Sequence, residues 1–252
     1  MSGIGSGYDL STTTYSPDGR VFQVEYATKA VDNGSLTAAV HARDGVVIAS
    51  ETLIASKLHV KGAQRRIGAV ARHAGMGASG YVPDARAVRD RARSECAQYK
   101  AFYGDSIPGK VLADRLGHYY HLFTLYWSVR PFGCASALAV KDDDGYHLYA
   151  LEPSGERTKM RGLCFGKGKS AAKTEVEKLN FSEMTCEEAV RALAKIVYAT
   201  HDVKDKDFEC ELCWICDASG GEFVRVPDAI ANDARRLAQV AISGDVDAMD
   251  AT

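Results

Sequence analysis

The sequence predicts an α+β fold built as a four-layer αββα sandwich, in which helices cover both outer faces of two antiparallel sheets. Turn sequences divide many β-prone segments into hairpins, and hairpins build antiparallel sheets. Segments with apolar residues at steps of three and four lie in groups between the hairpins. Grouped helices favour this class over the regular alternation of strand and helix that builds a parallel sheet.

Four turn signals define the predicted hairpins. Each places glycine between two apolar, β-prone segments, and they are Asp44-Gly45, Asp144-Gly145, Pro153-Ser154-Gly155 and Gly220-Gly221. Glycine reaches the positive φ angles that hairpin turns require. We therefore expect one further strand over 73–79 and hairpins around residues 36–52, 134–151, 148–166 and 211–226.

Apolar periodicity predicts the helices. Their expected ranges are 20–31, 85–102, 112–126, 172–179, 189–200 and 230–241. Pro108 opens the segment of the third helix, as proline often does near a first helical turn. Thr185 and Glu188 precede the fifth with the spacing of a capping box, in which each side chain satisfies a backbone N–H of the other residue.

The chain shows no linker, repeat or low-complexity stretch, so we predict one domain over residues 1–242. Within it, residues 1–19 form a polar extended arm and a tight turn, in which Pro17 fixes φ. Such an arm is costly to order, so contacts with something else should hold its residues. Residues 243–252 are small and acidic and are expected to form a disordered tail.

Composition excludes several classes of protein. The 252 residues are 46% hydrophobic and carry a formal net charge of −2, so we expect no nucleic-acid partner and no membrane partner. No apolar run approaches the roughly 20 residues that span a bilayer, and the N-terminus lacks the features of a secretory signal. Seven cysteines without such a signal favour free thiols in a reducing compartment. The simplest interpretation is a soluble intracellular protein.

Three motifs suggest cofactors at first inspection, and a structural role is favoured for each. Cys210, Cys213 and Cys216 have the spacing of part of an iron–sulfur or zinc ligand run, but on a strand the middle side chain points away from the other two. The segment 166–170 lacks the spacing of a phosphate-binding loop. His118 and His121 have no visible third ligand. We therefore predict neither a metal nor another cofactor.

The segment Tyr8–Ala27 decides the family. It resembles, nearly residue for residue, the N-terminal signature of proteasome alpha subunits. Further stretches also fit this family, and they are 129–134, 171–179 and 204–209. The resemblance covers about residues 5–240. Within the family, Gly7–Leu10 together with 204–209 look most like the alpha subunit in the seventh ring position.

The resemblance implies the N-terminal-nucleophile hydrolase fold, with 20–31 as the extra helix of alpha subunits. It also implies a non-catalytic place in the 20S core particle, where seven alpha subunits form a ring and beta subunits perform the proteolysis with an N-terminal threonine. The expected partners are other alpha subunits, beta subunits, and the regulatory particle or other activators. The expected function is ATP- and ubiquitin-dependent protein degradation, in the cytoplasm and the nucleus.

The catalytic residues of active family members are not kept. Alignment on the Asp44-Gly45 turn puts Ser35 at the position of the catalytic threonine, without a free amine. Glu51 falls on the catalytic aspartate and Arg66 near the catalytic lysine, and arginine cannot shuttle a proton because it stays protonated. The resemblance therefore implies an inactive subunit. The alternative is an active hydrolase that processes itself after Gly34 and uses Ser35.

Four residues match the cluster that stabilises an open gate in alpha subunits, and they are Tyr8, Asp9, Pro17 and Tyr26. In this interpretation a tyrosine hydroxyl hydrogen-bonds the aspartate of a neighbouring chain, and the rigid proline turn sets the angle of the arm. Leu10 replaces the arginine that usually follows the Tyr-Asp pair, which removes a charged partner.

Two further sites follow from the resemblance. Alpha subunits carry a lysine that pairs with the C-terminal carboxylate of activator tails, and Arg65 or Arg66 occupies the matching position. Arginine can hold a carboxylate with two parallel hydrogen bonds, and the alternative is an ordinary surface arginine. Ser243, in the acidic tail, resembles a phosphorylation site of this subtype.

Overall fold

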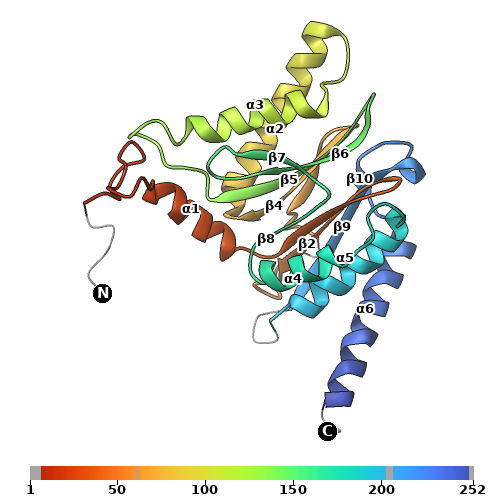
Figure 1. The fold of residues 1–252 in the computed structure, drawn as a ribbon. Helices are drawn as coiled ribbons and strands as arrows, with labels where there is room; N and C mark the ends of the chain where they lie inside the picture. The colour runs from red at the N-terminus through yellow and green to blue at the C-terminus, as the bar shows by residue number, and fades with distance from the viewer. Residues whose placement is uncertain (1–6, 61, 203–206, 250–252) are drawn as a thin grey trace.

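Two five-stranded sheets form the centre of the molecule (Figure 1). The structure is a computed structural model that describes residues 7–60, 62–202 and 207–249, with the backbone alone at 243–249. The first sheet has the order β10-β9-β2-β1-β8, with β1 (Thr37–Ala42), β2 (Gly45–Leu53), β8 (Gly162–Phe165), β9 (Phe208–Cys216) and β10 (Val224–Arg225). The second has the order β3-β4-β5-β6-β7, with β3 (Ile67–Ala71), β4 (Ala74–Gly80), β5 (Cys134–Asp142), β6 (Gly145–Leu151) and β7 (Arg157–Met160). Every pairing between the described strands is antiparallel, as the hairpin signals predicted.

Helices cover the outer face of each sheet. They are α1 (Phe22–Asp32), α2 (Val82–Tyr103), α3 (Gly109–Leu122), α4 (Lys169–Glu177), α5 (Cys186–Thr200) and α6 (Asp228–Met249). Helices α2 and α3 pack on the second sheet, α4 and α5 pack on the first, and α6 packs against α5 (Figure 1). Helix α1 lies against β4 and β5. The predicted four-layer αββα sandwich with an extra N-terminal helix is confirmed.

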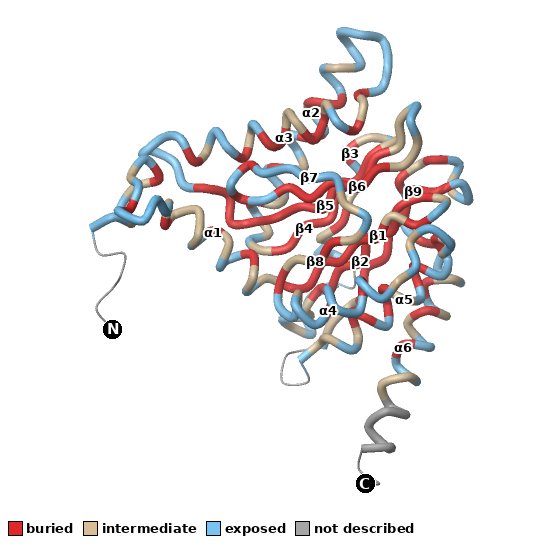
Figure 2. The backbone as a smooth tube through the Cα atoms, in the orientation of Figure 1, coloured by how far each residue is buried: buried red, intermediate tan, exposed pale blue. Residues whose placement is uncertain are grey.

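Buried side chains fill three layers, one between the sheets and one beneath each set of helices (Figure 2). Strand β9 shows how one strand serves two layers. Cys213 and Ile215 face the layer between the sheets, whereas Leu212 and Trp214 face the layer under α5 and α6. Successive side chains of a strand point to opposite faces, so a strand buried on both sides reads as a continuous apolar run.

The structure contains a strand that the sequence did not predict. Strand β3 has the sequence Ile67-Gly-Ala-Val-Ala, with glycine and alanine where strands favour larger, β-branched residues. Glu211 of β9 compensates through long-range contacts. Its carboxylate accepts the backbone N–H of Arg66 at 2.9 Å and that of Ile67 at 3.2 Å, which fixes the start of the strand.

Two predicted boundaries are wrong. Helix α3 ends at Leu122, not at residue 126, because the chain turns there and Phe123 stacks on Phe132 with ring centroids 4.3 Å apart. The hairpin predicted over 148–166 is formed by β6 and β7 alone. Strand β8 leaves that sheet and pairs with β1 in the other one, a long-range choice that the local pattern does not encode.

The C-terminal helix extends past the predicted start of the tail. Helix α6 is helical to Met249, so the secondary structure marks no boundary at residue 243. The segment contains no proline that would stop a helix. The division into a domain over 1–242 and a tail over 243–252 therefore stays a prediction. Among the described residues, no helix combines the length and the apolar character needed to cross a bilayer.

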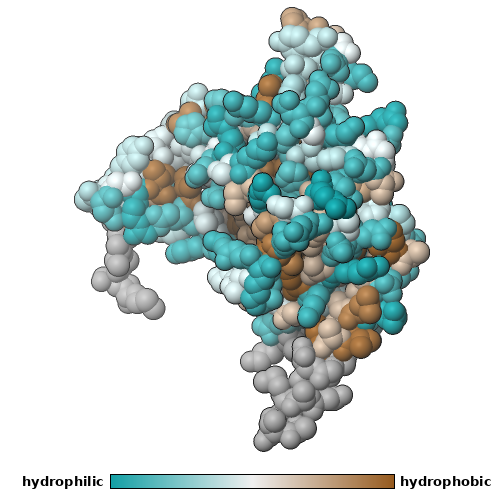
Figure 3. Space-filling view, turned by 45° about the vertical axis from the view of Figure 1, so that its right-hand side comes forward, coloured by the Kyte–Doolittle hydropathy of each residue, from teal (hydrophilic) through white to brown (hydrophobic). Residues whose placement is uncertain are grey.

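The outer edge of the second sheet is charged. Strand β7 lies at this edge, and Arg157, Thr158 and Lys159 are exposed along it. On the face drawn in Figure 3, hydrophilic side chains cover most of the body and hydrophobic ones form small, separate groups. Charged side chains on an edge strand discourage pairing with strands of other chains.

The capping box predicted before α5 is present. Thr185 Oγ1 accepts the Glu188 N–H at 3.3 Å, and the Glu188 carboxylate accepts the Thr185 N–H at 2.8 Å. The two residues therefore satisfy backbone donors that the first turn of a helix leaves without intrahelical partners.

Replacing the capping threonine should weaken the fold measurably. Thr185→Ala is expected to lower the free energy of unfolding by about 1 kcal/mol, because the Glu188 N–H loses its acceptor. Chemical unfolding of the purified subunit, followed by circular dichroism, measures the difference. In a double-mutant cycle with Glu188→Ala, the losses of unfolding free energy from the two substitutions should not be additive, because both substitutions disrupt the same capping box. Additive losses would contradict the capping box.

Candidate functional site

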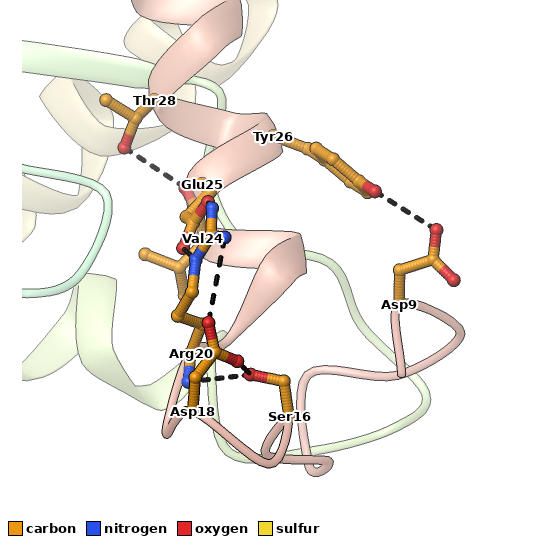
Figure 4. A network of polar contacts seen from close by, with 8 residues as sticks. All are labelled: Asp9, Ser16, Asp18, Arg20, Val24, Glu25, Tyr26 and Thr28. Atoms are coloured by element: carbon orange, nitrogen blue, oxygen red, sulfur yellow. Dashed lines mark hydrogen bonds and ion pairs between the residues drawn. The ribbon is translucent and has the colours of Figure 1, made fainter. Parts of the chain in front are cut away.

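The N-terminal arm ends in a tight turn just before α1 (Figure 4). The Gly19 N–H donates to Ser16 O at 2.9 Å, and Gly19 has a φ of +76°, which glycine adopts without strain. Pro17 occupies the second position of this turn, where its fixed φ is favourable. Arg20 then donates to Glu25 Oε1 at 2.7 Å, so the turn is joined to the first turn of α1. The turn predicted from Pro17-Asp18-Gly19 is confirmed.

The arm folds back on α1 through Asp9. The Tyr26 hydroxyl donates to Asp9 Oδ2 at 3.0 Å (Figure 4). The Gln23 side chain donates to the carbonyl oxygen of the same residue. The hydrogen bond to Asp9 raises the pKa of Tyr26 above its ordinary value. The structure thus brings together Asp9 and Tyr26 within one chain, whereas the sequence interpretation placed the aspartate on a neighbour. Tyr8 is exposed, and Leu10 is 87% exposed.

A loop at the end of α3 holds the middle of the arm. The hydroxyl of Thr12, a buried residue, donates to the carbonyl oxygen of Tyr126 at 3.1 Å. This loop is fixed in turn by the buried Asp84 of α2. Asp84 accepts two hydrogen bonds from Arg130, at 2.6 and 3.0 Å, and one from the Gly133 N–H at 2.8 Å. Sequence reasoning missed this contribution, because 46 positions separate Asp84 from Arg130.

The structure separates the two candidate arginines. Arg65 is exposed and donates to the carbonyl oxygen of Gly62 in its own loop at 3.2 Å. Arg66 is half-buried, and its guanidinium lies 3.5 Å from the carbonyl oxygen of Gly80. Burial lowers the pKa of Arg66, and the charges of Glu51 and Glu211 act in the opposite direction.

The residues that the sequence resemblance aligned with catalytic positions do not form a catalytic set. Ser35 is buried, and its Oγ has no hydrogen-bond partner among the described residues. Glu51 is occupied elsewhere, since it accepts the Leu36 N–H at 3.3 Å and lies 2.5 Å from His201 Nδ1. A hydroxyl nucleophile needs a base within hydrogen-bonding reach, and none is placed at Ser35 among the described residues.

The motifs that suggested cofactors have structural places. Cys210 and Cys216 face the helices and Cys213 faces the other sheet, as the strand pattern predicted. Gly168 caps α4 with a φ of +76°, so the glycine-rich segment connects a strand to a helix. In the part of the chain that the structure describes, no group of three or more His, Cys, Asp or Glu side chains could hold a metal ion.

Two family models match the chain. The model described as Proteasome subunit covers residues 31–215. The model for the N-terminal signature of A-type proteasome subunits covers residues 8–30, which include the arm, the turn and Tyr26. The chain belongs to the alpha-type proteasome subunits. Alpha-type subunits are the non-catalytic ring subunits of the 20S core, so the alternative of a self-processed hydrolase is not favoured.

Curated relatives match this alpha-type subunit over almost its whole length. The alpha type-3 proteasome subunit of Arabidopsis thaliana is 52% identical over 96% of this chain and 98% of its own length. The protein of the same name in Dictyostelium discoideum is 48% identical over 95% of this chain and 97% of its own. The probable alpha type-7 proteasome subunit of Saccharomyces cerevisiae is 46% identical over 98% and 88%. These names agree with the resemblance to the seventh ring position.

The candidate phosphorylation site Ser243 lies on the backbone of α6, at a position where the structure does not describe the side chain. Nothing in the geometry bears on it, and it stays a prediction from the sequence.

Removing the hydroxyl of Ser35 should leave function unchanged. We expect Ser35→Ala to leave the chain at full length and the peptidase activity of the particle unchanged, because the residue has no catalytic partner among the described residues. The free energy of unfolding should stay equal or rise, since an unsatisfied buried hydroxyl is lost. Mass spectrometry, a fluorogenic peptide assay and thermal unfolding measure the three quantities. Loss of peptidase activity with an unchanged unfolding temperature would instead identify Ser35 as a nucleophile.

Proposed function

We propose that this alpha-type subunit occupies one position of a seven-membered alpha ring, that its arm contributes to an axial gate, and that Arg66 binds the tails of activators. Beta subunits lie on one face of the ring, and the regulatory particle or other activators dock on the other. The particle serves ATP- and ubiquitin-dependent protein degradation. The hydrogen bond between Tyr26 and Asp9 carries the proposal, because it ties the arm to a helix.

The contacts of the arm suit a movable segment. The arm is held by the Tyr26–Asp9 bond, by the Thr12–Tyr126 bond and by the turn at Pro17. Asp9 and Tyr26 interact at an exposed site, where a hydrogen bond contributes only about 1 kcal/mol net. Such contacts define a preferred position for the arm and still let it leave that position.

The surroundings of Arg66 suit a carboxylate. A shallow hollow beside it is lined by three further arginines, Arg65, Arg86 and Arg89, and by the small apolar side chains of Ala78, Val82 and Ala85. Several guanidinium groups around one hollow give a positive local potential, which attracts an anionic end group. Within the described residues, the Arg66 guanidinium donates to Gly80 alone, so the rest of its donor fork is available for a carboxylate.

Removing the Tyr26 hydroxyl should impair gate opening. Tyr26→Phe is expected to reduce activator-stimulated hydrolysis of a fluorogenic peptide about fivefold, because the loss of roughly 1 kcal/mol shifts the arm away from its position on α1. The assay uses the assembled particle, with and without activator. Native mass spectrometry of the same sample checks that the subunit is present in the ring.

Tyr15→Phe is the matched control. Tyr15 lies on the same arm, is 72% exposed, and its hydroxyl makes no hydrogen bond within the described residues. The two variants lose the same atom, so equal losses of stimulated hydrolysis would contradict a specific role of the Tyr26–Asp9 bond.

Arg66→Ala should weaken the binding of activator tails about tenfold, which corresponds to roughly 1.4 kcal/mol for one charge-assisted contact. The probe is a synthetic peptide with a free C-terminal carboxylate, and fluorescence anisotropy with the assembled particle measures its affinity. The same peptide with an amidated C-terminus should bind both forms equally weakly. Arg65→Ala, which removes another guanidinium of the same hollow, should weaken binding less than Arg66→Ala does. A larger loss for Arg65→Ala would move the site to that residue.

Two parts of the proposal rest on resemblance alone. We place the subunit in the cytoplasm and the nucleus, and imaging of a tagged subunit that finds it in only one compartment would refute this. We also propose phosphorylation at Ser243, because the serine precedes an acidic segment. Phosphopeptide mass spectrometry that always finds Ser243 unmodified would remove that site.

A further inference from the structure

Two cysteines meet at a place remote in sequence from the arm and from Arg66. Cys186 is the first residue of α5, and Cys216 is the last residue of β9. Both side chains are buried in the layer between the first sheet and its helices. The Cys186 thiol lies beside the sulfur of Cys216, and each thiol shifts the pKa of the other. The molecule therefore contains a buried dithiol, defined here as Cys186 and Cys216.

The turn between β1 and β2 holds the dithiol in place. Asp44 Oδ1 accepts the Cys186 N–H at 2.7 Å, and the carbonyl oxygen of Asp44 accepts the Asp217 N–H at 3.0 Å. Gly45 pairs directly with Cys216 across the sheet. Asp44 thus binds the backbone of Cys186 and of the residue that follows Cys216, so the fold holds the two cysteines near one another.

The surroundings of Cys216 stabilise a thiolate. Cys216 caps the short 3-10 helix Asp217–Ser219, and its sulfur accepts the backbone N–H of Ser219. The Cys186 thiol, together with backbone and hydroxyl donors of the short helix, lowers the pKa of Cys216 to about 7. The pKa of Cys186 is raised, first by its hydrogen bond to Cys216 and then by burial and the Asp44 charge. The two thiols therefore differ in character, one nucleophilic and one protonated.

We propose that Cys186 and Cys216 form an oxidation site, in which a hydroperoxide converts the dithiol into a disulfide. The Cys216 thiolate attacks the terminal oxygen of the hydroperoxide, the O–O bond breaks, and alkoxide leaves (hydroxide when the oxidant is hydrogen peroxide), so that Cys216 becomes a sulfenic acid. The Cys186 sulfur then attacks the Cys216 sulfur, the S–O bond breaks, and the S–S bond forms. The departing hydroxide takes the Cys186 proton and leaves as water. The peroxide gains the two electrons that the thiols lose.

Access runs through the exposed turn that follows β9. Asp217, Ala218 and Gly220 are exposed and follow Cys216 directly in the chain, so a local opening of this one short turn is enough for a peroxide to reach the sulfur. Cys164 provides the internal comparison, since it is the one cysteine that is not fully buried. Exposure alone predicts that Cys164 reacts first, whereas the geometry of the dithiol predicts that Cys216 does.

A disulfide between Cys186 and Cys216 would join α5 to the first sheet. It closes a loop from the start of α5 to the end of β9, and a cross-link between distant residues stabilises a fold mainly by constraining the unfolded chain. An oxidised subunit should therefore unfold at a temperature several degrees higher than the reduced one.

Thiol mapping of the intact particle tests the proposal. The particle is purified from its own cells, exposed briefly to hydrogen peroxide, denatured in N-ethylmaleimide and digested without reduction. Mass spectrometry should find the peptides of Cys186 and Cys216 joined, with the joined form abolished by dithiothreitol and Cys164 still alkylated. Oxidation of Cys164, or of any other cysteine, while Cys186 and Cys216 remain alkylated would overturn the proposal.

Variants separate the two steps. In Cys186→Ser the second step has no attacking thiol, so the sulfenic acid of Cys216 should persist and its labelling by dimedone should rise severalfold. Cys164→Ser should leave the rate of disulfide formation unchanged. If Cys186→Ser fails to assemble, the mapping of the unsubstituted particle decides alone. Unchanged dimedone labelling of an assembled Cys186→Ser particle would contradict the two-step reaction.

Discussion

The position of the whole N-terminal region depends on one buried carboxylate. Asp84 stands in the first turn of α2 and binds Arg130 and the Gly133 N–H, so it fixes the loop that leads from α3 into β5. That loop carries Tyr126, which holds the arm through Thr12. A buried carboxylate without partners would be strongly destabilising. The stability of α2 therefore depends on the loop that supplies the partners of Asp84. The arm thereby receives its position from a part of the chain that lies more than 70 positions away.

The residues that the resemblance aligned with catalytic positions are Ser35, Glu51 and Arg66, and their contacts here are structural ones. In this chain Glu51 binds Leu36 and His201, and the latter ring packs on Phe208 with centroids 4.3 Å apart. The carboxylate has become part of the contact between α5 and β2. Glu51 therefore contributes to the packing of the subunit.

Much of the fold could be predicted because its signals are local. Glycine turns predicted most of the hairpins, apolar periodicity predicted the helices, and Thr185 with Glu188 indicated the capping box before α5. Strand β3 could not be predicted, because Glu211 lies 144 positions from Ile67, and the end of α3 was missed because Phe123 leaves the helix to pack on Phe132 in the next loop.

The candidate site, like the fold, could be predicted from the sequence only in part. Resemblance supplied Tyr8, Asp9, Pro17 and Tyr26, but it did not show that Asp9 and Tyr26 pair within one chain. It also left Arg65 and Arg66 equivalent, and the two differ in burial only once β3 is placed beside β4. The contact between Cys186 and Cys216 carries no local signal, because it exists only where a helix start, a strand end and the Asp44 turn converge.

The charged edge at β7 matters most before any assembly exists. Each subunit leaves the ribosome as a single chain, and two open sheets then present backbone groups to every other nascent protein. Arg157 and Lys159 line one of these edges, and like-charged copies of the same strand repel one another when they approach. The charged side chains of this one short strand thus protect the unassembled subunit from aggregation until it binds its partners.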